Sequence, residues 1–286
     1  MPELPEVETI RRGLEKSILH KNITDLDILK SRVLRNQGRW FKNFLKSKSI
    51  SGINRRGKLL ILEISGGSHL LLIHLKMTGQ LIYVLGKKVM TGGHNLPNLG
   101  ALPNKYSHVI FKFVDGSKLF FNDLRQFGYL RIIKAGDRSK IEQQYGIEPG
   151  HSDFKWSAFK KIFANRSTRL KSLLLNQQLI SGLGNIYVDE VCFRAKVRPD
   201  RLASSLSQAE IRALYNACQY IIKKAIAKRG TTFSDYRDHD NKPGNFFQHL
   251  KVYGRSGQKC LRCKKANIEK IRLAGRGTHF CPHCQK

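Results

Sequence analysis

Acidic residues are scarce in this chain. Its 286 residues include 21 Asp and Glu against 52 Lys and Arg, which gives a formal net charge of +31 and a pI of about 10.2. A positive charge of this size opposes compact folding unless a polyanion partly neutralises it. Nucleic acid is therefore the expected partner, with an acidic membrane surface as the alternative.

Long apolar runs are absent as well. A membrane-spanning helix needs about 18 or more apolar residues in a row, whereas a run such as Leu70-Leu71-Leu72-Ile73 ends at a histidine. The opening Met1-Pro2-Glu3-Leu4-Pro5-Glu6 lacks the basic start and the apolar core of a signal peptide. These absences disfavour a membrane protein, and we expect a cytoplasmic one.

Four of the six cysteines lie in the last 27 residues of the chain. Cys260 and Cys263 are followed, after 17 residues, by Cys281 and Cys284, which is the spacing of two zinc knuckles. Four thiolates leave no open coordination position on the metal. The sequence therefore predicts one structural Zn²⁺ per chain.

Two alternatives concern this cysteine cluster. A redox disulfide pair is disfavoured by a reducing cytosol, and substitution of a ligand by His279 or His283 is disfavoured by the regular cysteine spacing. The two remaining cysteines, Cys192 and Cys218, stand in apolar helical stretches. We expect them to be buried thiols without a chemical role.

The segment between the two cysteine pairs is predicted to form a hairpin, in which residues 267–273 pair with residues 278–280. Arg272 and Arg276 lie on this segment. A turn that is held by zinc and carries an arginine is suited to contact phosphates. The alternative is an ordinary solvated basic face.

The first half of the chain combines one helix with many short strands. Val7, Ile10, Leu14 and Ile18 recur at three- and four-residue spacing, which predicts an amphipathic helix over residues 6–20. This pattern is followed by β-rich runs at residues 50–53, 58–64, 70–75, 80–84, 108–114, 119–121 and 129–133. Turn signals separate the runs, which indicates an antiparallel β-sandwich or barrel.

From about residue 134 the hydrophobic period becomes helical. Helices are predicted at residues 156–163, 170–179, 185–194 and 207–230, and Ser207 and Glu210 form a plausible capping box at the start of the last one. We therefore predict an α+β multidomain chain. Its domains are residues 1–134 (helix and β-sandwich), 135–230 (helical) and 231–286 (a loop over 231–250, then the zinc-finger hairpin).

The second residue is a proline, and initiator methionine is normally removed before a proline. Its removal would leave a secondary amine at Pro2 that can attack a carbon centre and form a cationic imine, which acts as an electron sink. Glu3 is adjacent and is a candidate general acid or base. By itself, a proline at this position is more often only a processing signal.

Six motifs along the chain closely resemble those of the bacterial formamidopyrimidine-DNA glycosylases. They are Pro2-Glu3-Leu4-Pro5-Glu6-Val7-Glu8-Thr9, Arg55-Arg56-Gly57-Lys58, His74-Leu75-Lys76-Met77-Thr78-Gly79, Asn122-Asp123-Leu124-Arg125-Gln126-Phe127-Gly128, Gly182-Leu183-Gly184-Asn185-Ile186-Tyr187 and Arg276-Gly277-Thr278. The resemblance implies a β-sandwich domain, a helix–two-turn–helix domain and a C-terminal zinc finger.

The resemblance also implies roles for single residues. Pro2 matches the nucleophile that attacks the sugar C1′ and expels the damaged base, Glu3 matches the acid that assists ring opening, and Lys58 matches a phosphate-gripping residue that is also a candidate for the chemistry. Three further residues match positions that grip the phosphates around the lesion: His74, Asn185 and Arg276.

Met77, Arg125 and Phe127 match the side chains that fill the gap left by the flipped-out nucleotide. Reaching C1′ of a stacked nucleotide requires extrusion, so apolar wedges and an arginine that binds the orphaned base make physical sense. Taken singly, Met77 or Phe127 would more often be a core residue and His74 a hydrogen-bonded buried histidine. Their occurrence together favours the functional interpretation.

Four residues depart from the family pattern. Lys76 stands where glycine is expected, Leu124 where proline is common, Gln126 where a basic residue is frequent, and Arg198 where histidine is expected. None of the four matches a position assigned to chemistry. The first three bear on the void-filling loops, for example on the preference for the base opposite the lesion.

The sequence thus predicts a bacterial DNA glycosylase with abasic-site lyase activity, acting as a monomer on duplex DNA that contains oxidised purines such as 8-oxoguanine and formamidopyrimidines. An endonuclease VIII-like enzyme for oxidised pyrimidines is the nearer alternative, disfavoured by Leu4 where that pattern has glycine. A non-enzymatic zinc-finger protein is the more distant one, and it has no need of a free Pro2 amine.

Overall fold

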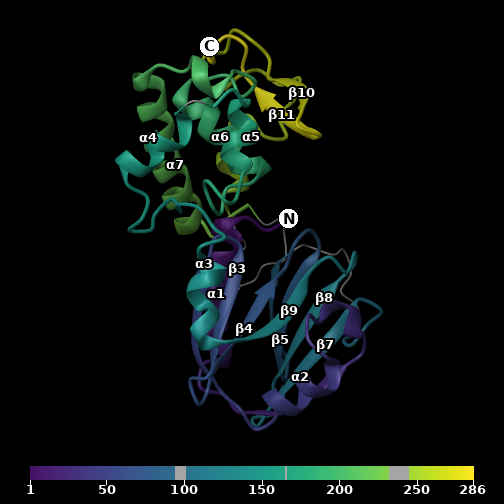
Figure 1. Cartoon of the computed structure of the whole chain (residues 1–286). Helices are drawn as coiled ribbons and strands as arrows, with labels where there is room; N and C mark the ends of the chain where they lie inside the picture. Colours follow the sequence, from purple (N-terminus) through teal and green to yellow (C-terminus); the bar gives the residue numbers. More distant parts are fainter. Residues whose placement is uncertain (94–100, 165, 232–244) are drawn as a thin grey trace. The chain divides into compact units, whose positions relative to one another are not determined.

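The computed structural model describes residues 1–93, 101–164, 166–231 and 245–286. Contacts divide the chain into two compact units, Met1–Gln143 with Lys228–Phe247, and Gln144–Ala227 with Gln248–Lys286. Figure 1 draws both units. The division into three domains at residues 134 and 230 stays a prediction, and the predicted loop over 231–250 lies largely outside the described residues.

The first unit is a sandwich of two antiparallel sheets. One sheet has the order β1-β7-β8-β5-β6 and the other the order β2-β3-β4-β9. The strands are β1 (Ile23–Ile28), β2 (Ile50–Arg56), β3 (Leu59–Ile64), β4 (His69–His74), β5 (Gly79–Leu85), β6 (Lys88–Gly93), β7 (Ser107–Phe113), β8 (Lys118–Asp123) and β9 (Tyr129–Lys134). The predicted antiparallel sandwich is thereby confirmed.

Helix α1 (Leu4–Ile18) packs against β2 of one sheet and β6 of the other. It buries Val7, Ile10, Leu14 and Ile18, the apolar face that the spacing predicted. These side chains belong to the core shared by both sheets. The N-terminus of the chain is therefore held on the sandwich by burial of a whole helical face.

Among the strands and the helices of eight or more residues in this unit, three were not predicted: β1, α2 (Gly38–Leu45) and β6. In β1 the register shifts between Ile23 and Asp25, and only Ile23 and Leu26 are buried. The bulge removes the strict alternation by which a strand is recognised in a sequence. Shorter helical pieces are η1 (Ser31–Val33), η2 (Ala135–Asp137) and α3 (Arg138–Glu142).

The second unit is helical and carries a hairpin. Its elements are α4 (Trp156–Phe163), α5 (Leu170–Leu175), α6 (Asn185–Ala195), η3 (Ala203–Ser205), α7 (Gln208–Ala227), β10 (Glu269–Leu273) and β11 (Arg276–Phe280), with η4 (Phe247–His249) at the boundary. The predicted hairpin between the cysteine pairs is confirmed. No helix in the described part of the chain is long and apolar enough to cross a membrane.

Two local predictions in this unit have different outcomes. The capping box is present, because Glu210 N donates to Ser207 Oγ (3.2 Å) and Ser207 N donates to Glu210 Oε2 (2.7 Å). The helix predicted over 170–179 ends at Leu175. There the Gln177 amide donates to the backbone oxygens of Leu175 and Leu183, both at 2.8 Å, which stabilises a turn instead.

Candidate active site, DNA interface and zinc site

The N-terminal residues are buried at the start of α1. Pro2 is buried, and Glu3 is the N-cap residue of the helix with 3% of its surface exposed. Glu3 N donates to Glu6 Oε2 at 3.0 Å. Glu3 and Glu6 form a reciprocal capping box, which fixes the backbone next to Pro2.

Glu6 also binds the segment that begins at Lys228. Thr231 donates to Glu6 Oε1 from its backbone N (2.7 Å) and its Oγ1 (3.0 Å). A Cβ at Gly230 would lie 2.5 Å from Glu6 Oε1, and its φ is +78°, so this position requires glycine. Glu6 is a positioning residue of the N-terminus that sequence reasoning did not single out.

The electrostatics around the N-terminus favour a neutral amine. Burial lowers the pKa of the Met1 amine, Lys58 acts in the same direction, and Glu3 and Glu6 oppose both. An amine at Pro2 after removal of Met1 would lie among the same groups. A lowered pKa leaves more of an amine in its neutral, nucleophilic form.

Lys58 and His74 lie in one row across the four-stranded sheet. Lys58 directly precedes β3, whose Leu59 pairs with His74 on β4, and His74 pairs with Tyr129 on β9. Both polar side chains are nearly buried, with 5% of Lys58 and 8% of His74 exposed. The structure thus places Lys58 near both the N-terminal amine and His74.

His74 is held as a neutral ring. Burial lowers its pKa to about 3, with Lys76 and Lys58 adding to the effect. Lys76 N donates to His74 Nδ1 at 3.0 Å, so the ring proton is on Nε2, which is left as a donor. His74 is therefore a buried histidine in which one ring nitrogen, Nδ1, is hydrogen-bonded to the backbone, while Nε2 can donate to a ligand.

The loops that precede β5 and β9 carry the predicted void-filling side chains. Met77 is 36% exposed and Phe127 is 49% exposed, so neither is a core residue. The Arg125 guanidinium lies over the Phe127 ring, 4.6 Å from its centroid. The three side chains therefore belong to an exposed surface of the first unit.

Asp123 ties these two loops together. It is fully buried, accepts a hydrogen bond from Thr78 Oγ1, and also accepts one from Gly128 N at 2.7 Å. Arg125 N donates to Thr78 Oγ1 at 3.0 Å. A buried carboxylate with several donors is a rigid anchor, so Met77 and Arg125 are presented from a fixed base.

In the second unit, Asn185 at the start of α6 is fixed to the hairpin. Its Nδ2 donates to Gly277 O at 3.0 Å, and Lys171 Nζ donates to the same oxygen at 3.1 Å. Lys171 pairs with Asp189 at 2.6 Å, and both side chains are completely buried. This network connects α5, α6 and β11.

Asp189 holds the hairpin through a second residue. His279 N donates to Asp189 Oδ2 at 2.8 Å. Arg276, the first residue of β11, is exposed at the tip of the same hairpin. The sequence singled out Asn185 and Arg276, whereas Lys171 and Asp189 were missed because only the tertiary fold brings them to the hairpin.

The four C-terminal cysteines converge on one point. Their sulfurs all lie within 4.8 Å of one another, and the Cys260–Cys284 and Cys263–Cys281 separations are 3.9 and 3.8 Å. A tetrahedron with Zn–S bonds of about 2.3 Å has S···S edges of roughly 3.8 Å. The donor set therefore fits one structural Zn²⁺.

The structure supports neither alternative for this cluster, a disulfide pair or a histidine ligand. All six cysteines are free, so no disulfide joins the pairs. His279 Nδ1 faces Asp189 at 3.1 Å, and within the described residues the candidate metal group contains the four cysteines without a histidine. Cys192 and Cys218 are fully buried, as expected.

The order of modules defines the class of protein: a zinc-containing DNA glycosylase with a helix-led β-sandwich and a helical domain. Three family models match in this order: the formamidopyrimidine-DNA glycosylase N-terminal domain (residues 1–130), the formamidopyrimidine-DNA glycosylase H2TH domain (145–237) and a zinc finger found in FPG and IleRS (257–286). The chain belongs to the formamidopyrimidine-DNA glycosylase family.

Relatives of full length support this assignment. The formamidopyrimidine-DNA glycosylase of Pelotomaculum thermopropionicum is 39% identical over 289 residues, with 100% of this chain and 99% of that protein covered. The corresponding protein of Heliobacterium modesticaldum is 40% identical over 290 residues, with both chains fully covered. The family resemblance seen in six short motifs thus extends to the whole sequence.

Solved structures agree. The Lactococcus lactis Fpg in complex with abasic-site-containing DNA has a TM-score of 0.88 and 37% identity, with 99% of both chains covered. A mutant of the same protein with Fapy-dG-containing DNA has a TM-score of 0.88 and 38% identity, with 100% of both chains covered. The fold expected from the resemblance is confirmed.

Proposed function

We propose that the chain is a base-excision-repair DNA glycosylase with abasic-site lyase activity, which removes oxidised purines such as 8-oxoguanine and formamidopyrimidines from duplex DNA. The observation that carries the proposal is the buried Pro2–Glu3 start, set beside Lys58, in a chain that matches formamidopyrimidine-DNA glycosylases along its full length. The enzyme acts as a monomer in the bacterial cytoplasm.

The chemistry is assigned to the N-terminal residues. After Met1 is removed, the neutral Pro2 nitrogen attacks C1′ of the damaged nucleotide. The N–C1′ bond forms, the glycosidic bond breaks, and the base leaves with that electron pair and with the proton that the Pro2 nitrogen gives up. Glu3 protonates the ring oxygen as the sugar opens, which leaves a cationic imine on Pro2. Successive loss of a C2′ and a C4′ proton then expels the 3′ and the 5′ phosphate.

Lys58 and His74 hold the DNA beside this centre. Lys58 contributes a buried charge next to the attacking amine and grips a phosphate. The neutral His74 donates from Nε2 to a phosphate oxygen, a contact that does not depend on pH near neutrality. Phosphate contacts fix position without reading sequence, as a scanning enzyme requires.

The remaining site residues are assigned to the extruded state and to the second unit. Met77 and Phe127 fill the gap in the base stack while Arg125 binds the orphaned base. Asn185 and Arg276 grip further phosphates. Zn²⁺ on Cys260, Cys263, Cys281 and Cys284 supplies no chemistry; it stabilises the turn that presents Arg276.

Within this proposal each of the three predicted domains has its own role. Residues 1–134 carry the chemistry, residues 135–230 bind DNA, and residues 231–286 supply a lesion-binding loop and the zinc finger.

Comparison of two substrates tests the proposal. The purified protein is incubated with matched duplexes that contain either 8-oxoguanine or thymine glycol, and base release and strand cleavage are measured for both. We expect faster release from the 8-oxoguanine duplex. Preferential action on thymine glycol would indicate an endonuclease VIII-like enzyme, and tight binding without release from either duplex would indicate a binding protein.

A further inference from the structure

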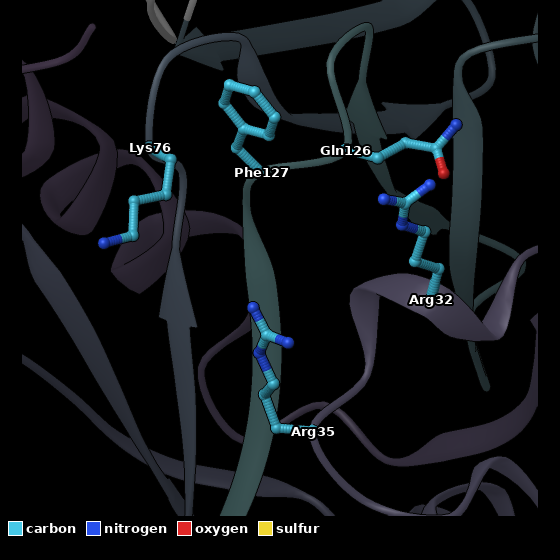
Figure 2. Close-up of a pocket in the computed structure, with 5 residues that line it drawn as sticks. All are labelled: Arg32, Arg35, Lys76, Gln126 and Phe127. Atoms are coloured by element: carbon cyan, nitrogen blue, oxygen red, sulfur yellow. The ribbon is translucent and has the colours of Figure 1, made fainter.

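A basic pocket lies beside the void-filling loops of the first unit. It has a volume of about 440 Å³ and is lined by Arg32, Arg35, Lys76, Gln126 and Phe127. Figure 2 shows Gln126 and Arg32 pointing toward one another. The lining contains three cations and no acid, which is the composition of an anion site.

The three cations have no acidic partner in the part of the chain that the structure describes. Several basic residues of this unit do have an acidic partner; Lys112, for example, lies 2.7 Å from Asp27. By contrast, Arg35 and Lys76 lie only against the Tyr129 ring, 5.5 and 6.0 Å from its centroid. Like charges that line one pocket without compensation repel one another unless an anion joins them.

The backbone at two lining positions is unusual. Lys76 has a φ of +50° and Gln126 a φ of +55°, a region that favours glycine. Lys76 is also the position at which the family resemblance led us to expect glycine. The chain therefore places a cation where the backbone disfavours any side chain, and that cation lines the pocket.

The pocket lies at the far end of the row that carries Lys58 and His74. His74 pairs with Tyr129, and Leu34, next to Arg35, bridges to Leu130. Three strand spacings of about 4.8 Å separate Lys58 from Arg35, roughly 14 Å in all. The grooves of a DNA duplex are about 6 to 12 Å wide, so the two ends of the row are spaced to hold the two backbones.

We propose that Arg32, Arg35 and Lys76 form a second phosphate site, which binds the backbone of the undamaged strand opposite the lesion. The inference rests on the proposed function, in which Lys58 and His74 hold the damaged strand. Lys76 adds to this site a cation that a glycine at the same position would not supply. The Phe127 ring forms one wall, so the bound phosphate also orients the wedge.

Binding of neutralised duplexes tests the site. Affinity is measured for a duplex with a tetrahydrofuran abasic-site analogue, which the enzyme binds without cleaving. Single uncharged methylphosphonate linkages are placed in turn along the undamaged strand and, in a second series, along the damaged strand. The proteins compared are wild type, Arg35→Gln, Lys76→Gly and a control, Lys87→Ala, which removes an exposed charge at the other end of β5.

We expect Arg35→Gln and Lys76→Gly to bind the unmodified duplex about five- to tenfold more weakly, and each to reduce the slope of log affinity against log salt by about one. Wild type should lose affinity at one or two linkages of the undamaged strand. On duplexes neutralised at those linkages, the two variants should bind as well as wild type does, because the charge that their missing side chains would contact is already absent. The control should behave as wild type throughout.

Three results would overturn the site: variants that bind like wild type, losses that persist in full at every neutralised linkage of the undamaged strand, or coupling to the damaged strand instead. Cleavage of the 8-oxoguanine duplex by wild type is measured in parallel. If wild type cleaves this duplex but the variants show no coupling to linkages of the undamaged strand, only the phosphate site is disproved. If the coupling is found but no cleavage occurs, only the proposed function is disproved.

Discussion

Lys171 and Lys76 show two opposite uses of a lysine. Lys171 is completely buried in the second unit, 2.6 Å from an equally buried Asp189. Lys76 is exposed in the first unit, has no acidic partner among the described residues, and has a left-handed backbone. The first charge is compensated inside the protein and the second is not.

The difference indicates which charges stabilise the fold and which are available to bind an anionic ligand. A buried pair contributes through geometry, since it fixes α5, α6 and β11 to one another. An uncompensated exposed cation contributes little to folding but lowers the free energy of a complex with a polyanion. A net charge of +31 is therefore tolerable, because much of it is neutralised only when DNA is bound.

The largest effect should follow from breaking the buried pair. Asp189→Asn leaves the Lys171 charge uncompensated and should lower the free energy of unfolding of the second unit by about 3 to 5 kcal/mol. Urea unfolding followed by circular dichroism measures this loss. The double variant Lys171→Met with Asp189→Leu should recover part of the stability, because neither charge of the pair is then left uncompensated, while His279 loses the acceptor of its backbone N–H.

The matched control is an exposed pair. Asp27→Asn removes the nearer of the two acidic partners of Lys112, which are Asp27 at 2.7 Å and Asp25 at 3.9 Å. The Asp27 and Lys112 side chains are both more than a third exposed, so the change should cost less than about 1 kcal/mol. Similar losses in Asp189→Asn and Asp27→Asn would contradict the distinction between buried and exposed pairs.

A smaller effect should come from His74, a buried side chain that is neutral in the folded protein. Its pKa is about 3 in the folded protein, so below its ordinary value of about 6.5 the unfolded chain binds the extra proton. The contribution of His74 to stability should be constant above that value and should fall on acidification, by up to about 1.4 kcal/mol per pH unit. His74→Gln should show a shallower fall between pH 6 and pH 4 in urea unfolding, and an unchanged slope would contradict the burial of a neutral ring.

The smallest effect concerns the folding cost of Lys76. Lys76→Gly should raise the free energy of unfolding by about 1 kcal/mol, because glycine adopts the left-handed backbone without strain. Lys76→Ala removes the same charge but keeps the strain, so it should give no such gain. Equal stability of the two variants in urea unfolding would show that the backbone here is not strained.

Elements with regular local patterns could be predicted from the sequence, whereas contacts between residues far apart in the chain could not. The face of α1, most sandwich strands, the capping box at Ser207 and the zinc cysteines all follow from local spacing. The bulged β1 and the shortened α5 were missed because local irregularity or a glutamine side chain overrides the pattern.

The same distinction holds for the candidate site. Pro2, Glu3 and the void-filling residues stand in recognisable motifs, so their candidacy could be stated from the sequence. Glu6 could not be recognised as a positioning residue, because its partner Thr231 is 225 positions away along the chain. The pocket with Arg35 was likewise invisible, since it forms only when the η1 segment pairs with β9.

Borohydride trapping on an 8-oxoguanine:cytosine duplex tests the central claim most directly. The mature protein is incubated with the duplex and borohydride, and the reduced adduct is mapped by peptide mass spectrometry alongside Pro2→Gly. We predict an adduct at Pro2 that accompanies strand cleavage and a strong loss of both in the variant. An adduct at another residue, or cleavage without any adduct once removal of Met1 has been verified, would contradict the account.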